Sequence, residues 1–178
     1  NTISGPVSLN SGVIDVDESS TLNSDLTLGG TARISLAEGK TLTYGGAALS
    51  LGANTLRISG SGTLSNMNAL VLSEAESILT LQGTNTISGP VSLNAGVIDV
   101  DESSTLDSDL TLGGSAMIYV APDKTLTYGG EPISLGANTL KFSGSGILSS
   151  TNAFVLSESE SILELRGTNT INGPVSLI

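Results

Sequence analysis

Short runs of alternating apolar and polar residues recur along the whole chain, and Gly, Asn, Ser or Asp separate them. Thr21–Lys40, for example, contains the runs TLN, DLTLG and ARISLA. Alternation over a few positions is typical of a β-strand with one buried face, and the separating residues favour tight corners. The pattern therefore predicts an all-β protein in which three short strands and their corners recur in a fixed order.

The strand pattern is part of a tandem repeat. The sequence NTISGPVSLN at 1–10 returns unchanged at 85–94 and returns as NTINGPVSLI at 169–178. The repeat length is 84 residues, and 64 of the 84 positions are identical in 1–84 and 85–168. Within each unit, a Thr followed by Leu or Ile marks intervals of 19, 20, 22 and 23 residues, although Ile147 replaces one Thr. We interpret each interval as one turn of a repeat architecture.

These features predict a right-handed parallel β-helix, that is, a β-solenoid with three short strands per turn of 19–23 residues and about eight and a half turns. Turns of this kind complete one another's core and stack at a strand spacing of about 4.8 Å. The uneven turn lengths favour the right-handed form, since left-handed forms keep a strict hexapeptide repeat. We expect one continuous solenoid over 1–178, with repeat units at 1–84 and 85–168, the start of a third unit at 169–178, and further repeats beyond both ends.

The apolar residues of successive turns should face inward in register. Leu26 should be fully buried between Val7 and Leu49 of the adjacent turns, whereas Thr27 should point outward. The expected inward pairs of the third strand of each turn in the first unit are Ile14/Val16, Ile34/Leu36, Leu56/Ile58 and Leu79/Leu81.

Composition fits a narrow core and excludes several classes of partner. Aromatic residues make up only 3% of the chain, so Leu, Ile and Val must fill the interior. The net charge of −11 argues against nucleic-acid binding, which needs Lys and Arg. Uninterrupted apolar runs such as Ala69–Leu72 are too short to enter a membrane. The expected partners are therefore neighbouring repeats of the same chain, with end-to-end or lateral self-association as a further alternative.

The candidate chemistry is limited to carboxylates. The chain has no His and no Cys, which excludes Ser-His-Asp catalysis and His or thiolate metal sites. We expect no enzyme activity and no cofactor. The acidic run VIDVDESS occurs in both units. We interpret it as a solvated outer face, and the alternative is that its carboxylate oxygens bind calcium. The calcium candidates are Asp15, Asp17, Glu18, Asp99, Asp101 and Glu102.

Three other features have a structural interpretation, and two of them also have an alternative. Tyr44 and Tyr128 should pack at corners. Residues 73–78, which read SEAESI, have a short helical corner as the alternative to a turn. The Thr that opens each interval should stack in one outward column, for which ice or surface-lattice binding is the alternative to ordinary strand pairing. That column would contain Thr2, Thr21, Thr41, Thr63, Thr86, Thr105 and Thr125.

The alternating strands, the GG and GSG corners, the acidic balance and the long near-identical repeats resemble the stalk regions of large bacterial surface proteins. Autotransporter passengers, filamentous-haemagglutinin-like adhesins and giant repeat adhesins are such families. The resemblance implies an extracellular location on the cell surface and a rigid spacer of an adhesin or filament. The alternative is a binding module that uses a repeated outer face for surface, glycan or ice adhesion. Pectin-lyase-like enzymes share this fold but need a cleft walled by long loops, and every corner here is short.

Overall fold

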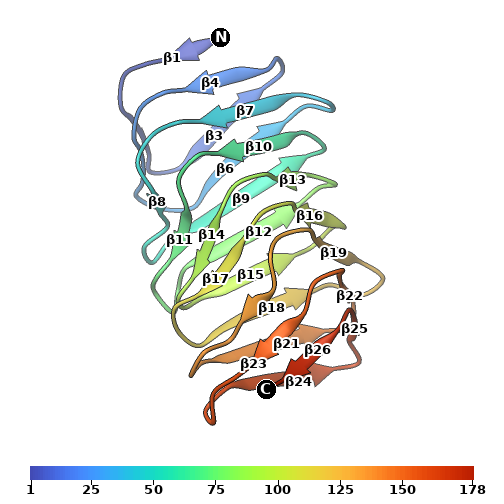
Figure 1. Cartoon of the computed structure of the whole chain (residues 1–178). Helices are drawn as coiled ribbons and strands as arrows, with labels where there is room; N and C mark the ends of the chain where they lie inside the picture. Colours follow the sequence, from blue (N-terminus) through green and yellow to red (C-terminus); the bar gives the residue numbers. More distant parts are fainter.

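The computed structural model covers residues 1–178 and shows a parallel β-solenoid with no helix, which confirms the predicted fold class. Its 26 strands form three faces that run the length of the molecule. The chain advances turn by turn from the N-terminus at one end to the C-terminus at the other (Figure 1). Eight strands on one face and nine on another correspond to eight turns and the beginning of a ninth. The right-handed sense of winding stays a prediction.

The first face is one unbroken sheet of nine strands, and most of them begin with the repeated Thr or one residue before it. Its strands are β1 (Thr2–Ile3), β4 (Ser20–Leu22), β7 (Thr41–Tyr44), β10 (Thr63–Asn66), β13 (Thr86–Ile87), β16 (Ser104–Leu106), β19 (Thr125–Tyr128), β22 (Ile147–Ser150) and β25 (Thr170–Asn172).

The other two faces take the second and third strand of each turn. The second face contains β2 (Val7–Leu9), β5 (Leu26–Leu28), β8 (Leu49–Ser50), β11 (Leu70–Leu72), β14 (Val91–Leu93), β17 (Leu110–Leu112), β20 (Ile133–Ser134), β23 (Phe154–Leu156) and β26 (Val175–Leu177). The third face contains β3 (Gly12–Val16), β6 (Ala32–Leu36), β9 (Thr55–Gly60), β12 (Ile78–Gln82), β15 (Val97–Val100), β18 (Ala116–Val120), β21 (Thr139–Gly144) and β24 (Ile162–Gly167).

The second face, unlike the others, is interrupted twice. Its strands form separate sheets, β2-β5, then β8-β11-β14-β17, then β20-β23-β26. The breaks fall between β5 and β8 and between β17 and β20, which are equivalent places in the two units. The repeat therefore includes a sheet break as well as its strands.

The register of stacking differs from the expected one at the same turn. Thr21 lies opposite Thr43, not Thr41. On the third face Ile34 lies opposite Ile58, where Leu56 was expected. Both differences are two residues, and the second unit repeats them. The physical reason lies at the end of β7, where Tyr44 takes the inward position opposite Leu22 and displaces the Thr-Leu pair of that turn. The separation of stacked residues thus reaches 24 positions, beyond the expected range of 19–23.

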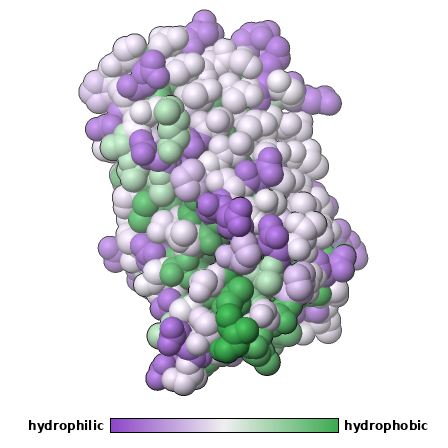
Figure 2. All heavy atoms as spheres, in the orientation of Figure 1, coloured by the Kyte–Doolittle hydropathy of each residue, from purple (hydrophilic) through white to green (hydrophobic).

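The interior is a continuous column of aliphatic side chains. One cluster of 36 buried apolar residues extends along the solenoid, from Leu9 to Phe154. Leu26 is buried and pairs with Val7 as expected, but β5 does not pair with the strand of Leu49. Apolar atoms are exposed mainly over the C-terminal turns (Figure 2), where Leu177 and Ile178 lie on the surface.

The corners depend on backbone turns with no helix. Gly60 has φ +86°, and a Cβ there would lie 2.0 Å from the carbonyl oxygen of Leu36 in the turn before, so only glycine fits. At 73–78 the chain forms a turn in which the Glu74 amide donates to Ser77 Oγ at 3.0 Å. The Ser77 hydroxyl donates in turn to the carbonyl of Gly52 in the preceding turn. The helical alternative for this corner is therefore wrong.

Candidate functional site

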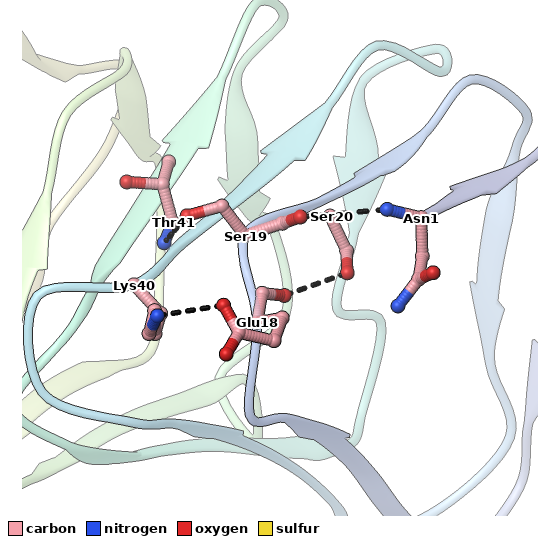
Figure 3. Close-up of polar contacts among 6 residues, drawn as sticks. All are labelled: Asn1, Glu18, Ser19, Ser20, Lys40 and Thr41. Atoms are coloured by element: carbon pink, nitrogen blue, oxygen red, sulfur yellow. Dashed lines mark hydrogen bonds and ion pairs between the residues drawn. The ribbon is translucent and has the colours of Figure 1, made fainter.

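The acidic run of the first unit makes an ion pair and a hydrogen bond to the next turn. Lys40 Nζ lies 2.6 Å from Glu18 Oε2, and the Thr41 amide donates to Ser19 Oγ at 3.1 Å (Figure 3). The hydrogen bond from Lys40 and its charge lower the pKa of Glu18. Ser20 Oγ donates to the carbonyl oxygen of Glu18 at 2.7 Å and closes the corner. In this structure, Glu18 is thus one half of an ion pair at a solenoid corner.

The second unit repeats this arrangement and adds contacts to the turn before it. Lys124 Nζ lies 2.6 Å from Glu102 Oε2, and Gln82 Nε2 donates to Asp101 Oδ2 at 3.2 Å. Burial, and then the charge of Asp101, raise the pKa of Asp99. Asp99 lies on the third face between Thr80 and Tyr119.

The structure does not gather the calcium candidates into one ligand set. Asp15 lies on the third face opposite Ser35, whereas Glu18 lies at the corner with Lys40. No group of three or more acidic side chains in the chain lies close enough together to hold a metal ion. A calcium ion at this corner would have to compete with the Lys40 ammonium for the Glu18 carboxylate.

The outward Thr residues form three rows in place of the single expected column, because the displacement recurs at β19, where Thr125 begins a row that continues through Ile147 and Thr170. The displacement at β7 separates a row that contains Thr2, Thr21 and Thr43 from a row that contains Thr41 and Thr63. Ser65 continues the first row opposite Thr43. The second row continues through Thr86, Thr105 and Thr127.

Each break in the second face holds a buried tyrosine hydroxyl. The Tyr44 hydroxyl donates to the carbonyl oxygen of Ala47 at 2.8 Å and accepts from the Leu26 amide at 3.2 Å. The corner is closed by Asp25 Oδ1, which accepts from the Ala47 amide at 2.8 Å. A hollow of about 360 Å³ opens outside this break, with Thr27 on its wall. Tyr44 is thus a corner-packing residue, as expected.

The second unit repeats the tyrosine arrangement with a changed wall. Tyr128 donates to the carbonyl oxygen of Glu131 at 2.7 Å and accepts from the Leu110 amide at 3.1 Å. Burial raises the pKa of the Tyr128 hydroxyl. Pro132 lines a hollow of about 280 Å³ at this break, where the first unit has Ala48. The two breaks therefore share their hydrogen bonds and differ in their surface.

The third face carries a second repeated hollow, and this one is basic. In the first unit it has a volume of about 300 Å³, and Arg33 and Arg57 both line it. In the second unit a hollow of about 290 Å³ contains Lys141 and Arg166. The first hollow is lined by Gly12, Val13, Thr31, Ala32, Arg33 and Arg57. The second is lined by Gly96, Val97, Ser115, Ala116, Met117 and Lys141 at the equivalent positions, and by Ala75, Ala95 and Arg166.

The basic hollow was not predicted from the sequence. Its signal was present, because four of the six basic residues occupy third strands of their turns. What the sequence could not supply was the pairing of β6 with β9, which places Arg33 directly opposite Arg57. With the expected register, Arg33 would have faced Thr55 instead.

The structure contains no helix long and apolar enough to cross a membrane. Comparison of the chain with protein-family models, with curated proteins and with solved structures gave no match.

Proposed function

We propose that this chain is a structural repeat segment that acts as a rigid spacer. The observation that carries the proposal is the continuity of the first face, where β1 to β25 pair in one parallel sheet across the boundary between the units. The joint between Thr63 of the first unit and Thr86 of the second is an ordinary strand pair. No flexible linker interrupts the stack at that joint.

Length follows directly from this arrangement. Each 84-residue unit contributes four turns, which add about 19 Å of axial rise at a strand spacing of about 4.8 Å. A further unit makes the same nearest-neighbour contacts as the last one, so it extends the rod and leaves the existing turns unchanged. Near-identical units therefore suit a part whose task is to set a distance.

The setting that we propose is an extracellular bacterial adhesin or surface filament. Its support is the resemblance in sequence style, namely long near-identical repeats without Cys and with an acidic balance. A net charge of −11 favours solubility and limits non-specific association at a crowded surface. In this role the chain needs no cofactor and catalyses no reaction, and its main partners are the neighbouring repeats.

Small-angle scattering on chains of two, three and four units tests the spacer proposal. The maximum dimension should grow by about 19 Å with each added unit. A radius of gyration that follows the scaling of a compact globule would contradict the proposal, because it would mean that the units fold back on one another.

A binding module that uses a repeated outer face remains the second candidate. The basic hollow favours it, because it recurs at the same place in both units. The separate Thr rows weigh against its ice-binding form, since Thr21 and Thr41 do not stack in one regular column.

A further inference from the structure

We propose that the hollow around Arg33 and Arg57 is an anion-binding site that holds one oxyanion group, such as a sulfate, phosphate or carboxylate, between two guanidinium groups. This inference is independent of the spacer proposal, because a rod of any length could carry such a site.

The two positive charges of the first hollow form no ion pair with a carboxylate of the chain. Arg33 on β6 and Arg57 on β9 are direct partners across parallel strands, and both side chains are exposed. Like charges directly opposite each other on a sheet are destabilising. Neither arginine takes part in any of the three ion pairs of the chain. An anion between the two guanidiniums would remove this repulsion.

Three of the four other basic residues form an ion pair with a glutamate, and this distinguishes the two arginines from them. In a chain with a net charge of −11, Lys40 and Lys124 are each paired with a glutamate at 2.6 Å. On β3, the strand that pairs with β6, Asp15 lies opposite Ser35 and forms no ion pair with Arg33. The chain thus has carboxylates to spare and still leaves these two arginines without one.

The shape of the hollow suits a small planar or tetrahedral oxyanion. Small residues, Gly12 and Ala32, form part of its lining, and a Cβ at Gly12 would meet no atom within 4 Å, so the space there is open. Thr31 adds a hydroxyl to the wall. Guanidinium groups offer forked N–H donors that match the paired oxygens of such anions. The volume of about 300 Å³ admits one such group with its waters.

The second unit has kept two cations in this hollow although one of them changed position. Met117 replaces Arg33 and Lys141 replaces Arg57, but Arg166 stands where the first unit has Gln82. Arg166 Nε lies 2.7 Å from Glu164 Oε1, and Glu164 also lies opposite Lys141. The second hollow is therefore partly neutralised, and we expect it to bind an anion more weakly than the first.

Side-chain Nε–H resonances of arginine in the 178-residue chain give the direct test. The chain is titrated with sodium sulfate, and with sodium chloride at matched ionic strength. Arg33 and Arg57 should shift saturably with sulfate in the millimolar range, and Arg166 should shift less. Parallel titrations with sodium phosphate and sodium acetate identify which oxyanion the site prefers. Shifts that do not saturate, or that are the same with chloride, would overturn the proposal.

Variants separate this site from the general ion atmosphere. Arg33→Met, which copies the second unit, should weaken sulfate binding at Arg57 by about tenfold, because a charge-assisted donor is lost. Lys40→Met changes the net charge equally but lies outside the hollow, and it should leave the affinity unchanged. Equal weakening by both variants would show a diffuse electrostatic effect and would overturn the site. Met117→Arg provides an independent gain-of-function arm and should strengthen binding in the second hollow.

Discussion

The phenolic hydroxyl of Tyr44 accepts a hydrogen bond from the backbone amide of Leu26 at 3.2 Å, across the break between β5 and β8. In the paired part of the same face, the equivalent amide of Leu70 donates to the carbonyl oxygen of Pro90 in the next turn at 3.0 Å. The tyrosine hydroxyl thus takes the place of a main-chain carbonyl where the sheet is interrupted. At this point a side chain, and not a neighbouring strand, accepts the hydrogen bond of the buried Leu26 amide.

The substitution Tyr44→Phe should destabilise the chain by about 1–3 kcal/mol, because it leaves the amide of Leu26 and the carbonyl of Ala47 without their partner. Amide hydrogen exchange at Leu26 should accelerate in the same variant. Tyr119→Phe is the matched control, since Tyr119 lies partly exposed on the third face and its hydroxyl makes no hydrogen bond within the chain. Equal melting temperatures for the two variants would show that the Tyr44 hydroxyl does not support the break.

Leu26→Asp should cost about 3–5 kcal/mol of stability, because it places an unpaired charge in the apolar column. Leu26 is only 5% exposed and stacks on Val7 of the previous turn. Thr27→Asp introduces the same group one residue later on the exposed side of the strand and should change stability by less than about 0.5 kcal/mol. Chemical denaturation of both variants measures the contrast, and a silent Leu26→Asp would mean that the strand faces the other way.

Asp99→Asn should raise the melting temperature at neutral pH. The folded pKa of Asp99 lies above its ordinary value of 3.8, so the folded chain disfavours the carboxylate. Stability linked to this group is fully present below the unfolded pKa and is lost as the pH rises through the folded pKa. The advantage of the variant should therefore disappear at pH values below about 3.8. Asp15→Asn, at the exposed equivalent position, should show a smaller change in the same melting series.

Removal of calcium should leave the melting temperature unchanged, because Lys40 already occupies the Glu18 carboxylate and Asp15 lies on a different face. The measurement is thermal unfolding with and without a calcium-specific chelator. A drop of several degrees on chelation would assign the acidic run as a calcium site. In that case, the variant Asp17→Asn would show whether the Asp17 carboxylate is one of the ligands.

Sequence alone predicted the solenoid because its signals are local and repeated. The alternation within each strand and the recurrence of Thr-Leu are both visible without any knowledge of stacking. The register was correct where equivalent residues simply stack, as for Leu56 and Leu79. It was wrong where Tyr44 competes with Leu42 for the inward position opposite Leu22, because that choice depends on the shape of the core.

The candidate site could be predicted less well for a related reason. Glu18 and Lys40 lie 22 residues apart, and only the path of the intervening turn brings them within 2.6 Å. Arg33 and Arg57 depend in the same way on the displaced register of β6 and β9. Contacts between turns are set by turn length, and turn length is the least regular property of this repeat.

The two-residue displacement at β7 and β9 has a consequence for any long array of these units. The hydrogen-bonded row that begins at Thr2 passes through Thr21, Thr43 and Ser65. The residue that is equivalent to Thr2 in the next unit no longer lies in this row. Two strand residues correspond to about 7 Å around the perimeter. Equivalent side chains of successive units therefore trace a shallow screw thread along the rod. In a filament of such units, a patch that recurs in every unit would face a new direction each time and would not line up along one side of the rod.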